Sequence, residues 1–173
     1  MRHAKSDWST ESTSDHDRPL NDRGIRDAPA MAGWIADSGF LPDLVLCSSA
    51  KRTQQTAALL FSFWKHTGWE VPGIVIAPDL YLSSAETVFE VIARESAGIP
   101  EGATATPRTM LVLAHNPGIS HAASIVAGHA VGLPTAALVV VKCGVADWSV
   151  PLSSDVTQWV AEMKPKSLAG EGR

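Results

Sequence analysis

The run that most limits the possible folds is residues 109–114, Thr-Met-Leu-Val-Leu-Ala, which is apolar and carries no alternating polar side chains. A strand of this kind is covered on both faces, as in parallel sheets that lie between two layers of helices. Shorter apolar runs at residues 44–47 and 74–76 are also followed by helical patterns. Strands that alternate with helices predict an α/β fold with a mainly parallel sheet.

The remaining pattern divides the chain into helices, turns and loops. Asn21 is the predicted N-cap of a helix that closes at Gly39, and Pro29 should kink this helix or delay its start. Ser48 or Ser49 should cap the next helix, and the capping box from Ser83 to Glu86 begins another. Other predicted segments are a loop at 5–20, an exposed connection at 98–108, an antiparallel strand pair at 136–142 and 147–150, a short helix at 155–163, and a disordered tail at 164–173.

The bulk properties of the chain exclude several classes of protein. Its 173 residues suffice for one domain, which we place at residues 1–163. A net charge of −4 gives no reason to expect binding to nucleic acid or to an anionic membrane. The sequence shows no signal peptide and no apolar run long enough to cross a bilayer, which predicts a cytoplasmic protein. Cys47 and Cys143 lie in apolar runs and are interpreted as reduced core residues, with a disulfide as the alternative.

Four basic side chains follow predicted strands or open the chain. Arg2 and His3 stand at the start, Arg52 lies in the first turn of a helix, and His115 ends the run 109–114. Strand ends that lead into helix starts meet at one edge of an α/β sheet, where ligands bind. A first-turn arginine opposes the helix dipole, and a bound anion would offset that cost. The four side chains together could bind a phosphoryl group and attack it.

Other site types fail on spacing. The histidines and cysteines do not form a zinc-binding pattern, and neither a Walker loop nor a Gly-x-Ser-x-Gly elbow occurs. Cys47 and Arg52 are four residues apart with no glycine between them, which does not fit the phosphate loop of cysteine phosphatases. We therefore expect neither a metal nor a cofactor.

The chain resembles the histidine phosphatase superfamily, and within it the short SixA-type phosphohistidine phosphatases. The resemblance runs from residue 2 to about residue 152 and is carried by residues 2–6, 17–24, 42–46, 52–57 and 115–117. It implies a three-layer, phosphoglycerate-mutase-like fold. It also implies that His3 is the nucleophile and that Arg2, Arg52 and His115 bind the phosphoryl oxygens.

The resemblance does not specify the leaving group of the substrate or the residue that would act as the general acid. Ser49 joins the expected substrate-binding set, and the candidate acids are Glu86 and Asp17, together with Asp15 from the same loop. Weak provision of an acid favours phosphohistidine, which releases an imidazole, over a phosphate ester. The expected partner is therefore a phosphohistidine-bearing protein such as a phosphotransfer domain. The alternatives are a small-molecule phosphomonoesterase and an inactive module that binds phosphate or a phosphoprotein.

One departure from the family concerns the residues before Arg2. The family places a central strand there, whereas only Met1 precedes Arg2 in this sequence. We therefore expect a missing first strand, unpaired backbone groups beside it, and a mobile or displaced His3.

Overall fold

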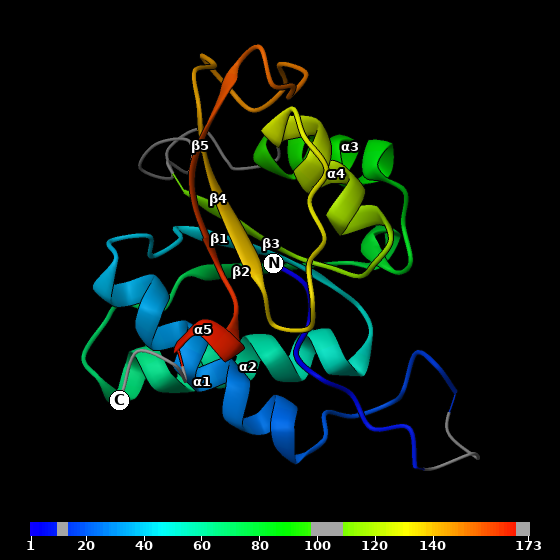
Figure 1. The fold of residues 1–173 in the computed structure, drawn as a ribbon, viewed down its shortest axis with the longest axis vertical. Coiled ribbons are helices and arrows are strands. Elements are labelled where there is room, and N and C mark those ends of the chain that lie inside the picture. The colour runs from blue at the N-terminus through cyan, green and yellow to red at the C-terminus, as the bar shows by residue number, and fades with distance from the viewer. Residues whose placement is uncertain (10–13, 98–108, 169–173) are drawn as a thin grey trace.

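The computed structural model describes residues 1–9, 14–97 and 109–168, and its helices lie below and to the right of the strands in Figure 1. The predicted connection at 98–108 and the centre of the predicted loop at 5–20 lie outside the described residues. The elements follow in the order α1 (Asp22–Asp37), β1 (Leu44–Ser48), α2 (Lys51–His66), β2 (Gly73–Ala77), a 3₁₀ turn (Pro78–Leu80), α3 (Ala85–Ala97), β3 (Met110–Leu113), α4 (Gly118–Ala127), β4 (Leu138–Cys143), β5 (Thr157–Met163) and α5 (Pro165–Leu168).

Strand β1 forms the middle of a parallel sheet with the order β2-β1-β3. Its alternate side chains enter two different apolar clusters. Val45 and Cys47 pack with residues of α1 and α2, whereas Leu44 and Leu46 pack with residues of α3 and α4. The two helix pairs lie on opposite sides of the sheet (Figure 1). The predicted α/β fold with a parallel sheet between helices is confirmed.

The C-terminal third differs from the sequence prediction. Strand β4 pairs antiparallel with β5, at residues 157–163, and not with residues 147–150. The helix predicted at 155–163 is wrong because the segment alternates between half-buried and exposed side chains at every residue. That two-residue period is the period of a strand. Part of the predicted disordered tail forms α5, and residues 169–173 lie outside the described residues.

The helix starts agree only in part with the predicted caps. The Asn21 side chain accepts a hydrogen bond from the backbone N–H of Gly24, which confirms it as the N-cap of α1. This helix begins at once and contains Pro29, so the predicted delay is wrong. Neither Ser48 nor Ser49 is the N-cap of α2, because Ala50 takes that position without a side-chain hydrogen bond. In α3 the cap is Ser84, whose hydroxyl accepts from the N–H of Thr87.

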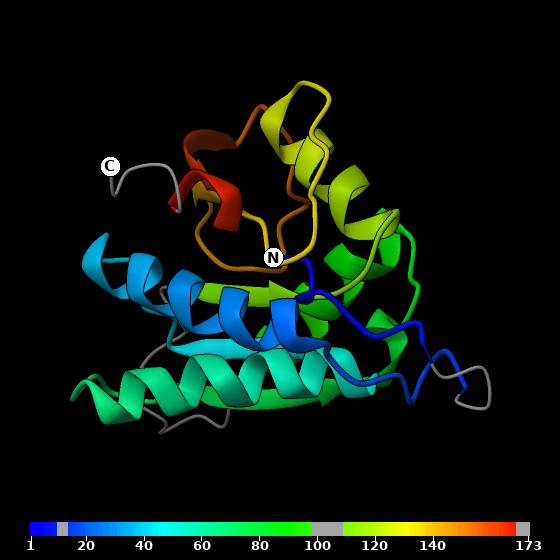
Figure 2. The same ribbon diagram turned by 60° about the horizontal axis from the view of Figure 1, so that its bottom comes forward.

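The first three residues form a short stretch of parallel pairing beside β3. The Met1 amine donates to the carbonyl of Val112, and the N–H of Ala114 donates back to Met1. The N–H of His3 then donates to Ala114. On the other side, Arg2 and His3 bond to the backbone of Ala137 and Ala136. The N-terminus therefore lies in the middle of the molecule, between β3 and β4 (Figure 2).

These bonds correct the expectation of a mobile or displaced His3, because its backbone is held from both sides. The space expected from the missing first strand is present. A cavity of about 770 Å³ lies next to Met1 and is lined by apolar residues of β3, β4 and α4. Met110, Leu111 and Val112 border it and are only half-buried, although the sequence predicts a strand covered on both faces.

Two further predictions concern the state of the cysteines and the absence of a membrane-spanning segment. Both Cys47 and Cys143 are free thiols, Cys47 buried and Cys143 half-buried. Within residues 1–9, 14–97 and 109–168, no helix is long and apolar enough to cross a bilayer.

Candidate active site

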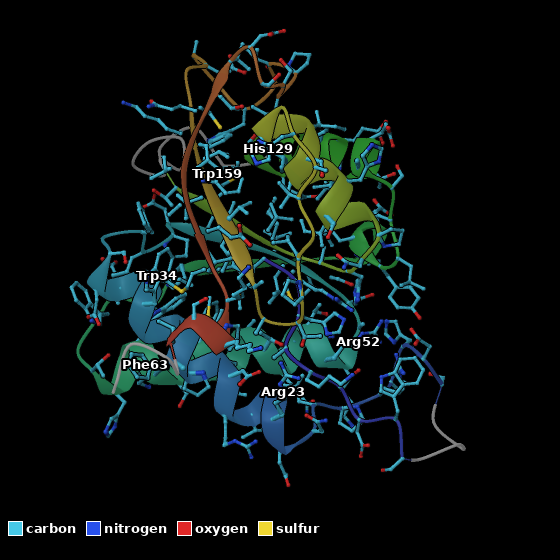
Figure 3. The ribbon with its side chains drawn as sticks, viewed as in Figure 1. Arg23, Trp34, Arg52, Phe63, His129 and Trp159 are labelled. Carbon is cyan, nitrogen blue, oxygen red and sulfur yellow. The ribbon has the colours of Figure 1, made fainter. Side chains whose placement is uncertain are left out.

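The site forms where β1, β3 and the N-terminal residues end at one edge of the sheet. Strand β1 leads to Arg52 in the first turn of α2, and His115 follows Ala114 after β3. The guanidinium Nη2 of Arg52 lies 3.1 Å from Nδ1 of His115. The rings of His3 and His115 are 5.1 Å apart, centroid to centroid. Figure 3 shows Arg52 at the end of α2 that faces the N-terminal stretch.

His3 is held in a neutral form with one free ring nitrogen. Its Nδ1 lies 2.7 Å from the backbone carbonyl of Ala4. A carbonyl only accepts hydrogen bonds, so Nδ1 carries the proton and Nε2 keeps its lone pair. Burial, together with the nearby charge of Arg52, lowers the pKa of His3 to about 4. At neutral pH this ring therefore carries an unprotonated nitrogen that requires no base to deprotonate it.

His115 is also neutral, with the opposite ring nitrogen protonated. Arg52 can only donate, so Nδ1 of His115 accepts and Nε2 carries the proton. That Nε2 lies 2.8 Å from the hydroxyl of Ser48, which accepts from it. Burial, followed by the charge of Arg52, lowers the pKa of His115 to about 3. The ring thus fixes the orientation of Arg52 without adding a charge of its own.

Three arginines hold unused hydrogen-bond donors at this end of the molecule. Among the described residues, the buried side-chain nitrogen and oxygen atoms without a partner are Nε of Arg2, Nε of Arg52, and Nε and Nη1 of Arg18. Burying such donors unpaired is costly, which indicates that an acceptor belongs among them. The charge of Arg18 also lowers the pKa of His3, which places it within electrostatic range of that ring. An anion with several oxygens would pair these donors.

Three residues of this region were not predicted from the sequence to belong to the site. Ser48 is fully buried and positions His115, Arg18 stacks its guanidinium 3.4 Å from the ring centroid of Trp8, and the Tyr81 hydroxyl donates to Asp15 across 2.6 Å. Ser48 ends the same strand that leads to Arg52, and this position was a usable signal. Arg18 and Tyr81 reach the site through loops, which no periodicity predicts.

The remaining candidate residues are Ser49 and three carboxyl groups. The Ser49 hydroxyl is bonded to Nε2 of His16, 3.0 Å away, at the rim of the site. Asp17 is exposed and accepts from Ser14, and this bond lowers its pKa. Glu86 is exposed at the start of α3, where its own backbone N–H lowers its pKa. Asp15 also has a lowered pKa, first through its bond from Tyr81. All three carboxyl groups are therefore ionised at neutral pH.

Comparison with known proteins places this geometry in a family. Residues 1–73 match the family model described as the histidine phosphatase superfamily, branch 1. An uncharacterized protein of Mycobacterium tuberculosis is 39% identical over 127 residues, which cover 73% of this chain and 70% of that protein. The chain belongs to the histidine phosphatase superfamily. Among solved structures, this histidine phosphatase superposes on a SixA protein from Agrobacterium tumefaciens with a TM-score of 0.74, 24% identity and 95% of each chain covered. A SixA protein from Nakamurella multipartitia gives 0.71 and 26% identity, over 95% of this chain and 93% of that one.

The buried neutral histidines of this histidine phosphatase make its stability depend on pH. Both pKa values lie below the ordinary 6.5, at about 4 for His3 and about 3 for His115. A group with a lowered folded pKa stabilises the fold above its unfolded pKa, and that stability is lost as the pH falls below it. Between pH 7 and pH 5 we expect each ring to cost about 2 kcal/mol of unfolding free energy. Urea unfolding at both pH values measures this loss.

The matched variants separate the two buried rings from the exposed histidines. His3→Asn should lose about half of the pH dependence that these rings cause, whereas the same change at the exposed His66 should preserve it. Equal pH dependence in the wild type and in His3→Asn would show that His3 is not held neutral by the fold.

Proposed function

We propose that this chain is a phosphatase that removes the phosphoryl group from phosphohistidine in a protein, through a phosphohistidine intermediate on its own His3. The observation that carries the proposal is the hydrogen bond from Nδ1 of His3 to Ala4, which leaves Nε2 unprotonated beside buried arginines. A lone pair and a cluster of cations are the two requirements of phosphoryl transfer to nitrogen. A SixA protein that shares this fold is described as a protein histidine phosphatase, which agrees with the proposal.

In the first step, Nε2 of His3 attacks phosphorus and the bond from phosphorus to the substrate imidazole breaks. The substrate ring takes up a proton from solvent on its other nitrogen and leaves neutral. Arg2 and Arg52 bind the non-bridging oxygens, and Arg52 is held in place by His115 and by the backbone carbonyl of Asp15. Guanidinium groups suit this role because they present paired donors in one plane. Such donors act on the charge that is redistributed in the transition state.

In the second step, water attacks the phosphoryl group on His3. The bond from phosphorus to Nε2 breaks, the attacking water gives up its proton to solvent, and inorganic phosphate leaves. His3 returns to its neutral form with Nδ1 bonded to Ala4. Every step uses groups of this chain, solvent and the substrate.

The state of the carboxyl groups supports an imidazole leaving group. A sugar phosphate releases an alkoxide, which needs a protonated acid at the site. Asp15, Asp17 and Glu86 all have lowered pKa values, so none of them holds a proton at neutral pH. An imidazole leaves without such help. Phosphohistidine is therefore the better substrate for this arrangement than a phosphate ester.

The alternative of an inactive binding module rested on a poorly anchored His3. The backbone of His3 is in fact bonded to both Ala114 and Ala136, which removes that reason. The phosphomonoesterase alternative is tested by comparing kcat/KM for the two kinds of substrate. We expect kcat/KM for a phosphohistidine-bearing phosphotransfer domain to exceed that for a sugar phosphate by at least about 100-fold, the smallest factor that a positioned acid usually supplies.

This comparison needs a control because phosphohistidine also hydrolyses spontaneously. The His3→Ala variant, assayed with both substrates, gives the background rate to subtract. A corrected kcat/KM that is equal for the two substrates, or higher for the sugar phosphate, would make the chain a small-molecule phosphomonoesterase instead.

A further inference from the structure

The carboxylate of Asp15 bonds to Arg52, which the proposed function assigns to the phosphoryl group, and to Arg18. One of its oxygens accepts from Nη2 of Arg52 at 3.0 Å and from the Tyr81 hydroxyl at 2.6 Å. The other oxygen accepts from Nη2 of Arg18. Nη1 of Arg52 donates to the backbone carbonyl of the same Asp15. Two arginines from different parts of the chain are therefore joined by one carboxylate.

Burial is uneven across this group. The side chains of Arg52 and Arg18 are 2% and 10% exposed, whereas that of Asp15 is 46% exposed. The cations are thus fixed in the body of the site and the anion lies at its mouth. A half-exposed carboxylate on a loop can leave at small cost, because water replaces its hydrogen bonds. The buried arginines cannot leave in the same way.

A carboxylate also satisfies these arginines incompletely. With Asp15 in place, Nε of Arg52 and both Nε and Nη1 of Arg18 have no partner. A phosphoryl group presents three anionic oxygens where the carboxylate presents two, and guanidinium groups bind it in a planar, paired geometry. It can therefore pair donors that Asp15 leaves unused.

We infer that Arg18 is a further phosphoryl-binding residue and that the carboxylate of Asp15 occupies the phosphoryl position until the substrate displaces it. The inference rests on the proposed function for the identity of the anion. Tyr81 holds Asp15 in place through its hydroxyl, so the tyrosine stabilises the closed, substrate-free arrangement. The apparent affinity for phosphate is then lower than the intrinsic affinity by the fraction of molecules in which Asp15 has left.

The inference is tested by calorimetric titration of inorganic phosphate into the full chain, which requires no turnover. Asp15→Asn keeps the shape of the side chain and removes the competing charge. We expect it to bind phosphate at least about 10-fold more tightly than the wild type, because a charge-assisted bond no longer has to be broken. Tyr81→Phe, which loses only the hydroxyl that holds Asp15, should also bind more tightly.

Two matched variants control for general changes in charge. Asp17→Asn removes the same charge two residues away, from a carboxylate that accepts from Ser14 and His16 instead, and should bind like the wild type. Arg18→Met should bind at least about 10-fold more weakly, for the loss of one charge-assisted bond. Arg23→Met is its control, because Arg23 lies on α1 away from Arg52 and pairs with Asp27 (Figure 3).

Asp15→Asn and Arg18→Met should change the phosphate affinity in opposite directions, which separates the possible roles of the two residues. Unchanged or weaker phosphate binding by Asp15→Asn would show that Asp15 only positions Arg52, and the inference would be wrong. If Arg18→Met binds phosphate as Arg23→Met does, Arg18 is not part of the site. A melting temperature measured for each variant shows that folded proteins are being compared. If the binding shifts appear but no substrate is turned over, the inference stands and the proposed function fails.

Discussion

Replacing His3 with alanine is expected to lower kcat on phosphohistidine by about 10⁴-fold or more, as the loss of a covalent nucleophile does in other enzymes. The reason is that no other described group offers the same combination. His115 is buried next to His3, but its Nδ1 accepts from Arg52 and its Nε2 carries a proton, so neither nitrogen has a free lone pair. Steady-state rates, corrected for spontaneous hydrolysis, measure the effect.

The control for this substitution is His121→Ala, which removes an exposed histidine on α4 and should retain full activity. Binding of inorganic phosphate to His3→Ala should remain measurable, because the arginines stay in place. A His3→Ala protein with activity near that of the wild type would show that the reaction does not pass through His3, whatever the fold resembles.

Extending the chain before Met1 with five or six apolar residues is expected to raise both stability and activity. Met1 already pairs in parallel with β3, and the cavity of about 770 Å³ continues from it between β3 and β4. An added strand would fill this cavity and bond to the free edge of β3. Burying a large apolar side chain stabilises by about 1.5–3 kcal/mol and ordering a residue costs about 1–2 kcal/mol, so five residues give a net gain of about 3 kcal/mol.

The buried amine of Met1 adds a second, separable effect. Burial lowers the pKa of this amine from 8.0 to about 5, so its contribution to stability is lost as the pH falls from 8.0 toward 5. A Gly-Ser extension of the same length converts the amine to an amide without adding apolar side chains. At pH 7 this extension should raise the free energy of unfolding by only about 1 kcal/mol, which is the cost of keeping the Met1 amine uncharged.

Activity should follow stability in the apolar extension, because Arg2 and His3 continue directly from the added strand. Small misplacements of a reacting group can cost about 100-fold in rate, so a firmer backbone should increase kcat. Thermal melts and phosphatase rates of the three proteins decide the question. Equal melting temperatures and equal turnover in all three would mean that the cavity does not accept a strand and that residues 1–3 are already fixed.

The sequence predicted the parts of the fold that local patterns control. The apolar runs at 44–47, 74–76 and 109–114 are strands, and the 3.6-residue period behind Asn21 is a helix. It failed where a pairing partner lies far away in the chain. Residues 157–163 form a strand because they pair with the edge of β4. Ser48, which the sequence suggested as a helix cap, is instead hydrogen-bonded to His115.

The sequence predicted which residues meet at this edge of the sheet, but not their electrostatics. The placement of Arg2, His3, Arg52 and His115 at one edge depends on strand order, which the βα alternation indicates. The protonated nitrogen of each ring depends on single contacts, namely Ala4 for His3 and Arg52 for His115. The position of the Asp15 carboxylate between two arginines depends on the path of a loop, and no sequence pattern specifies that path.

The most direct test of the account is to trap and locate the covalent intermediate. The protein is mixed with a phosphohistidine-bearing domain labelled with ³²P, quenched in alkali within milliseconds, and digested for mass spectrometry. We expect an acid-labile, alkali-stable phosphate on His3, attached to Nε2, and its absence in His3→Ala. Turnover with no labelled His3, or a label on Asp15 or another carboxyl group that a parallel acid quench keeps and alkali removes, would contradict this expectation.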